Sequence, residues 1–189
     1  MNTKQQIIEL ATALMKQKGY KGWSYQDISN GMGIKKASIH YYYPSKENLV
    51  LEVVKIYANG FLSKLDLLLK EPTSNLEKLK KLFALYRTSY YSYDEICLCT
   101  ILSADYHMLP QEVLDCLEHF NQELIKKLCY IFKEGVAKGE FNKNFDCDIM
   151  AHLSINTLQG LLITSKFFSG PRVFENCTDQ LLKFVKTGE

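Results

Sequence analysis

Proline and glycine are scarce in this sequence of 189 residues, which has four Pro and ten Gly spread thinly along it. This composition excludes the long disordered linkers that are rich in these residues. No apolar run approaches the roughly 18 residues of a membrane-spanning helix, and no basic start followed by an apolar run marks a signal peptide. We therefore expect a cytoplasmic protein with no membrane partner, and its 47% of hydrophobic residues suffices for a packed core.

Motifs of common enzymes and metal sites are absent too. The nucleophile elbow G-x-S-x-G, the phosphate loop G-x-x-x-x-G-K-[S/T] and the zinc motif H-E-x-x-H do not occur. The six Cys form no C-x-x-C pair, and the four His stand at no zinc-ligand spacing from them. We expect no enzymatic activity, no metal and no cofactor. In a cytoplasmic chain the cysteines are expected to be reduced, and most of them to be small buried hydrophobic residues.

Apolar residues recur at intervals of three and four along most of the chain, which is typical of amphipathic helices. No alternating strand pattern and no internal repeat interrupts them. We predict an all-α fold, with a three-helix N-terminal helix-turn-helix head and about six helices in a C-terminal body. The first predicted helix ends at Gly19, and the others span about 24–32, 35–42, 45–71, 74–92, 94–106, 110–138, 146–168 and 172–186.

The charge of the chain is distributed unevenly. Residues 1–48 carry seven Lys against three acidic residues, whereas the remainder carries 16 basic and 18 acidic residues. A basic end on a near-neutral body is typical of a DNA-facing head, because proteins gain affinity for the DNA backbone by neutralising phosphates.

Residues 24–46 contain two short helical patterns joined by a turn at Gly33, which indicates a helix-turn-helix. The second helix of such a motif places its N-terminal residues at base edges. Lys36 is our first choice for a base contact, since its ammonium can reach guanine acceptors, and the small Ala37 permits close approach. The predicted DNA contacts are Ser24, Tyr25, Lys35, Lys36, Ala37, Ser38, His40, Tyr41, Tyr42 and Lys46.

The aromatic residues of this segment also fit a packing role. We expect Tyr43 to pack inward, with Tyr41 and Tyr42 facing outward to reach phosphates through their hydroxyls. For His40, a phosphate contact and a packing role fit the sequence equally well.

The block Tyr-Tyr-Tyr-Pro-Ser-Lys-Glu-Asn-Leu at 41–49, preceded by Gly-Ile-Lys-Lys at 33–36, resembles the head of the TetR family of bacterial transcriptional regulators. The resemblance extends over about residues 4–54. It implies three helices in the head and about six in a ligand-binding body. Lys36, Tyr41, Tyr42 and Lys46 match DNA-contacting positions of the family. Lys35, Ala37 and His40 depart from its usual small polar residue, glycine and tyrosine, which could alter the operator preference.

The resemblance further implies a homodimeric repressor that binds a palindromic double-stranded DNA operator and is released by a small-molecule effector. A dimer is physically expected, because one head contacts few base pairs and two-fold symmetry matches a palindromic operator. We predict a DNA-binding domain at 1–48, extended by the start of the fourth helix to about 61, and an effector-binding and dimerisation domain at 49–189. A DNA-binding architectural protein without a ligand is a second class that the sequence leaves open.

The last two helices would form the dimer interface in this family, although their apolar residues also fit an ordinary core. The predicted interface residues are Ile149, Leu153, Leu158, Leu161, Leu162, Leu181, Leu182, Phe184 and Val185.

Aromatic and apolar residues of the middle helices fit a pocket for a mostly hydrophobic effector, and each of them fits plain core as well. The pocket set is Tyr86, Tyr90, Cys97, Tyr106, His107, Met108, Phe120, Tyr130 and Phe167. As an alternative, Cys97 or Cys99 could sense oxidants or electrophiles, since these two thiols lie near a helix start, where a thiolate is favoured.

Overall fold

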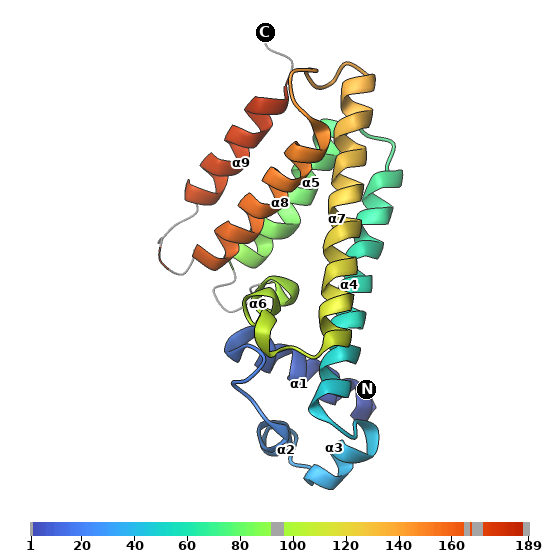
Figure 1. The fold of residues 1–189 in the computed structure, drawn as a ribbon, viewed down its shortest axis with the longest axis vertical. Coiled ribbons are helices and arrows are strands. Elements are labelled where there is room, and N and C mark those ends of the chain that lie inside the picture. Colours follow the sequence, from blue (N-terminus) through green and yellow to red (C-terminus); the bar gives the residue numbers. More distant parts are fainter. Residues whose placement is uncertain (1, 92–96, 165–166, 168–171, 187–189) are drawn as a thin grey trace. The chain divides into compact units, whose positions relative to one another are not determined.

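The computed structural model of the chain describes residues 2–91, 97–164, 167 and 172–186, with the side chains of 89–91 outside the description. The described part contains nine α-helices and one 3-10 turn (Figure 1). The helices are α1 (Thr3–Lys18), α2 (Tyr25–Met32), α3 (Lys36–Tyr42), α4 (Lys46–Lys70), α5 (Asn75–Tyr91), α6 (Leu98–Ala104), α7 (Gln111–Ala137), α8 (Cys147–Thr164) and α9 (Arg172–Val185), and the turn is η1 (Tyr106–Met108). The predicted all-α fold is confirmed.

The helix predicted at 94–106 is shorter than expected. Within the described residues it starts at Leu98 and ends at Ala104, and a separate 3-10 turn follows. Asp105 ends the helix, because its N–H bonds to the Leu102 carbonyl three residues back rather than four. Likewise, α8 ends at Thr164 rather than at 168.

The chain forms two compact units. The first comprises Met1–Gly60 and Cys97–Phe120, and the second comprises Phe61–Ile96 and Asn121–Glu189. Both α4 and α7 therefore run from one unit into the other. That residues 49–189 act as one effector-binding and dimerisation domain stays a prediction. Among the helices of the described residues, none is both long and apolar enough to cross a bilayer.

Local signals set the ends of the first two helices. The Asn2 side chain accepts a hydrogen bond from the Gln5 N–H at 2.9 Å and caps α1. Ser24 caps α2 in a reciprocal capping box with Asp27. Gly33 ends α2 with φ +66°, a left-handed conformation that favours glycine. This glycine makes the tight turn into α3 possible and so completes the helix-turn-helix.

Tyr25 crosses the head and holds the start of α4 to α2. Its side chain is buried, with 8% of its surface exposed. Its hydroxyl lies 2.9 Å from the Tyr43 carbonyl and 2.6 Å from the Ser45 carbonyl, and it donates to this pair of acceptors. Burial raises the pKa of Tyr25 to about 12, so the hydroxyl stays protonated. The predicted phosphate contact of Tyr25 is therefore wrong: its only hydroxyl hydrogen is already committed to the fold.

A second polar contact joins α6 to the head within the first unit. The Tyr20 N–H donates to the Asp105 carboxylate at 2.7 Å, just after the C-terminus of α6. Gly19 precedes it with φ +67°, and a Cβ there would lie 2.7 Å from the same carboxylate oxygen. Only glycine satisfies both the left-handed backbone and this close approach.

In the second unit, α5 packs against both α8 and α9, and α8 packs against α9. Phe132, Leu158 and Phe174 belong to its buried core. At the start of α5, the Glu140 carboxylate accepts hydrogen bonds from the Asn75 and Leu76 N–H groups at 2.6 and 3.2 Å. This carboxylate satisfies two of the N–H groups that the start of α5 leaves without helical partners.

We expect Tyr25→Phe to lower the free energy of unfolding by about 1–2 kcal/mol, because two buried carbonyls lose a donor. Urea denaturation measures this loss. Tyr41→Phe is the matched control, since the Tyr41 side chain is 82% exposed, and it should change the stability by less than about 0.5 kcal/mol. Equal stability of the two variants would contradict the role given to the Tyr25 hydroxyl.

Candidate functional site

The exposed face of α3 is the candidate DNA-binding surface. Ile39 is fully buried and Tyr43 nearly so, which fixes α3 on the head and turns the opposite face to solvent. The inward packing predicted for Tyr43, and the outward position of Tyr41 and Tyr42, are confirmed. The exposed predicted contacts on and beside this helix are Lys35, Lys36, Ala37, Ser38, His40, Tyr41 and Tyr42. Their contact with DNA stays a prediction.

A hollow of about 570 Å³ lies beside this face. Its lining comes from the start of α1 and from the segment that leads into and through α3, namely Thr3, Ile34, Ala37, Ser38, Tyr41 and Tyr42. The Tyr41 and Tyr42 rings meet edge to face, with centroids 5.2 Å apart. The lining therefore combines apolar carbon with three kinds of hydroxyl and carries no charged side chain.

Lys46 points into the head instead of standing free. Its Nζ donates to the Trp23 carbonyl at 2.6 Å and lies 4.4 Å from the Trp23 ring and 5.0 Å from the Tyr20 ring. Desolvation lowers its pKa. A phosphate contact by Lys46 would compete with these interactions, and that contact stays a prediction.

Two further predicted contacts have partners within the head. The Ser24 hydroxyl accepts from the Gln26 N–H at 3.2 Å and donates to Asp27 at 2.9 Å, so it serves the α2 cap. The His40 Nδ1 lies 3.2 Å from the Pro44 carbonyl, and its ring meets Tyr25 edge to face at 4.8 Å. His40 is nevertheless exposed, and its phosphate contact stays a prediction.

Five of the predicted dimer-interface residues belong to the core of their own unit instead: Leu158, Leu161, Leu162, Leu181 and Val185 are buried. Leu182 is half-buried and lines a groove against α5. Ile149, Leu153 and Phe184 are exposed, as an interface requires, and so are Ile163, Val173 and Phe167. Leu158, Leu161 and Leu162 were misplaced because apolar residues occur on every face of α8, whereas Leu181 and Val185 lie on the buried face of α9.

The predicted effector residues are divided between the two units. Cys97, Tyr106, His107, Met108 and Phe120 belong to the first unit, and Tyr86, Tyr130 and Phe167 to the second. Tyr106, His107, Met108, Tyr130 and Phe167 are exposed, whereas Tyr86, Cys97 and Phe120 are buried. The Tyr90 side chain lies outside the described residues. That these residues line one effector pocket stays a prediction.

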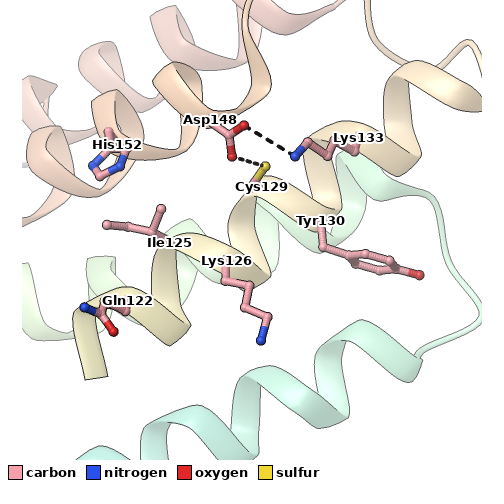
Figure 2. A pocket seen from close by; sticks show the side chains of 8 residues that line it. All are labelled: Gln122, Ile125, Lys126, Cys129, Tyr130, Lys133, Asp148 and His152. Atoms are coloured by element: carbon pink, nitrogen blue, oxygen red, sulfur yellow. Dashed lines mark hydrogen bonds and ion pairs between the residues drawn. The ribbon is translucent and has the colours of Figure 1, made fainter. Parts of the chain in front are cut away.

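The second unit carries a groove of about 400 Å³ between α7 and α8 (Figure 2). It is lined by Gln122, Ile125, Lys126, Cys129, Tyr130, Lys133, Asp148 and His152. Of these, only Tyr130 was predicted. The α7 residues recur every three or four positions, but their mixture of charged, polar and apolar side chains is also typical of an ordinary solvent-facing surface. No distinct signal in the sequence therefore marks this groove.

One carboxylate organises the polar side of this groove. The Cys129 thiol donates to Asp148 at 2.9 Å, and the Lys133 Nζ lies 3.4 Å from the other carboxylate oxygen (Figure 2). These donors lower the pKa of Asp148, the thiol contributing most. Burial, followed by the bond to Asp148, raises the pKa of Cys129. The thiol is therefore held protonated and is a poor nucleophile.

The opposite situation holds at Cys97 in the first unit. The pKa of its thiol lies below the usual thiol value, and the neighbouring Cys99 thiol is the main cause. The same pairing, together with burial, raises the pKa of Cys99 in turn. Both sulfurs are buried. In the part of the chain that the structure describes, no three His, Cys, Asp or Glu side chains gather closely enough to hold a metal.

Comparison with known proteins places these features in a family. Residues 7–53 match the family described as "Bacterial regulatory proteins, tetR family", and residues 75–181 match the "Tetracyclin repressor-like, C-terminal domain". The chain is 28% identical over 148 residues to the HTH-type transcriptional repressor KstR2 of Mycolicibacterium smegmatis, covering 78% of this chain and 71% of that one.

Two further similarities agree with this match. The biofilm operon icaADBC HTH-type negative transcriptional regulator IcaR of Staphylococcus epidermidis is 32% identical over 127 residues, which cover 66% of each chain. The crystal structure of a TetR-family transcriptional regulator from Agrobacterium tumefaciens is 24% identical, covers 97% of both chains and superposes with a TM-score of 0.92. The chain belongs to the TetR family of bacterial regulatory proteins.

Proposed function

We propose that this chain is a dimeric repressor that binds a palindromic operator through α3 and is released by a small, mostly hydrophobic effector. The observation that carries the proposal is the face of α3: Lys36, Ala37 and Ser38 are exposed on a helix that Ile39 fixes on a packed head. The names of KstR2 and IcaR as a repressor and a negative regulator support the sign of regulation. For the effector, the ring of the buried Tyr86 meets the Phe61 ring edge to face at 5.8 Å and supplies apolar aromatic surface in the second unit.

We expect Lys36→Ala to weaken binding of a selected operator by about tenfold or more, since one good base contact contributes about 1–3 kcal/mol. Fluorescence titration at two salt concentrations measures the loss and its salt dependence. Lys64→Ala, an exposed lysine of α4 in the second unit, is the matched control and should bind within about twofold of the unchanged protein.

If the unchanged protein binds the operator no better than scrambled DNA, the proposed function is refuted. If Lys36→Ala weakens operator and scrambled DNA equally, Lys36 contacts phosphates and not bases. The same titration identifies effectors as compounds that lower the affinity of the unchanged protein for the operator.

The dimer interface is proposed to be a seam on α8 and α9. Ile149, Leu153 and Ile163 are exposed on α8, and Asn156 and Gly160 fill the intervening positions, so that the spacing alternates between four and three. This spacing places all five on one helix face. On α9, Val173 and Phe184 are exposed as well. Large apolar side chains aligned on one exposed face are typical of a protein-binding surface.

We expect Leu153→Asp to convert the dimer to a monomer, because a carboxylate at the seam would be buried without a partner. Sedimentation velocity at micromolar concentration distinguishes the two states. Leu67→Asp is the control: Leu67 is exposed on α4, outside the seam, so this variant should remain dimeric. A dimeric Leu153→Asp variant would exclude this seam as the interface.

A second candidate function, a thiol-based redox switch, is favoured by the lowered pKa of Cys97. A peroxide would oxidise the Cys97 thiolate to a sulfenic acid with release of hydroxide. The Cys99 thiol, two residues along the chain, would then displace water and form a Cys97–Cys99 disulfide. Burial of both sulfurs restricts the reagent to a small molecule.

If this switch operates, peroxide should produce the Cys97–Cys99 disulfide before it oxidises Cys177, and should abolish operator binding until a reductant is added. Mass spectrometry of the alkylated peptides identifies the modified thiols. The Cys97→Ser variant should bind the operator equally well with and without peroxide. Oxidation of Cys177, a half-buried thiol of α9, as fast as that of Cys97 would argue against the switch.

A further inference from the structure

The DNA-binding head contains no arginine. Both arginines of the chain, Arg87 and Arg172, lie beyond residue 60, and all seven cations of residues 1–48 other than histidine are lysines. A planar guanidinium is the group that reads guanine with two parallel hydrogen bonds. A lysine ammonium can reach the same guanine acceptors but lacks this rigid planar fork. Any guanine contact by the head therefore depends on lysine.

The face of α3 offers no bidentate reader of adenine either. The sequence of α3 contains neither Asn nor Gln, the side chains that pair with the adenine edge. His40 is held by the Pro44 carbonyl and by Tyr25. Besides the lysines, the exposed groups on and beside this helix include the Ala37 methyl, the Ser38 hydroxyl and the rings of Tyr41 and Tyr42.

The hollow beside α3 suits one feature of the major groove. Ile34, Ala37 and the edge-to-face pair of tyrosine rings give it apolar walls, and no charged side chain lines it. Ala37 is small and exposed, so its Cβ leaves the hollow open. Among the four bases only thymine presents a methyl group in the major groove.

We propose that Ala37 selects thymine: the 5-methyl group of one thymine in each operator half-site lies in this hollow against the Ala37 Cβ. The inference rests on the proposed DNA-binding function and specifies what α3 reads. The methyl is excluded from water between the Ala37 Cβ and the Ile34 side chain, beside the base contact proposed for Lys36.

The test replaces each thymine of a selected operator by deoxyuridine, which removes only the methyl group. We expect one thymine per half-site to be sensitive, with a loss of about fourfold in affinity, the size typical of one buried methyl or methylene group. With Ala37→Gly the loss at this position should fall below about 1.5-fold. Ala37→Ser, which places a hydroxyl against the methyl, is a second variant should the glycine disturb the helix.

Methylation of cytosine separates the methyl group from the rest of the base. With cytosine at the sensitive position, 5-methylcytosine should restore about the fourfold that deoxyuridine removes. If no deoxyuridine changes the affinity by more than about 1.5-fold, or if the loss persists in both Ala37 variants, the inference is overturned while the proposed function stands. If the unmodified operator binds no better than scrambled DNA, the proposed function fails, and the inference fails with it.

Discussion

The position of α3 depends on a single buried side chain and the contacts around it. A helix of seven residues is not stable alone, because too few hydrogen bonds offset the cost of ordering its backbone. Ile39 supplies its fully buried contact with the head, and Tyr43 continues that contact just beyond its end. The Tyr25 hydroxyl then holds the carbonyls on either side of Pro44. The position of the candidate DNA-binding surface therefore depends on how firmly this small cluster is packed.

Several polar side chains near the candidate DNA surface serve the head itself. The Lys46 ammonium lies over two aromatic rings and donates a hydrogen bond to the Trp23 carbonyl, and Ser24 caps α2. Cations and hydroxyl groups that could add affinity for DNA are thus used to stabilise the head. The groups left exposed for DNA are concentrated on α3, where Lys35, Lys36 and Ser38 stand free of the core.

The sequence predicted the helices well because their ends carry short-range signals. Gly33 and Ser24 act within a few residues, and the structure uses both as caps. The block at 41–49 identified the head for the same reason. Residue orientation within the body was harder to predict. On α8 apolar residues occur on every face, so the periodicity could not separate the buried Leu158 from the exposed Ile163.

Contacts between distant segments escaped prediction entirely. The bond from the Tyr20 N–H to Asp105, like that from Cys129 to Asp148, joins residues whose proximity depends on tertiary packing. Tyr25 shows the same limit at shorter range: a tyrosine at the start of a helix fits a phosphate contact, and only the packed head reveals that its hydroxyl faces two carbonyls.

The close approach of Gly19 to Asp105 has a consequence for how this chain can change. A side chain at position 19 would displace the carboxylate that holds the next residue, and it would strain the backbone as well. Shortening the residue at 105 would relieve the crowding but would forfeit the hydrogen bond and leave the strain. The effects of substitutions at these two positions are therefore not additive, and they form one epistatic pair across α1 and α6.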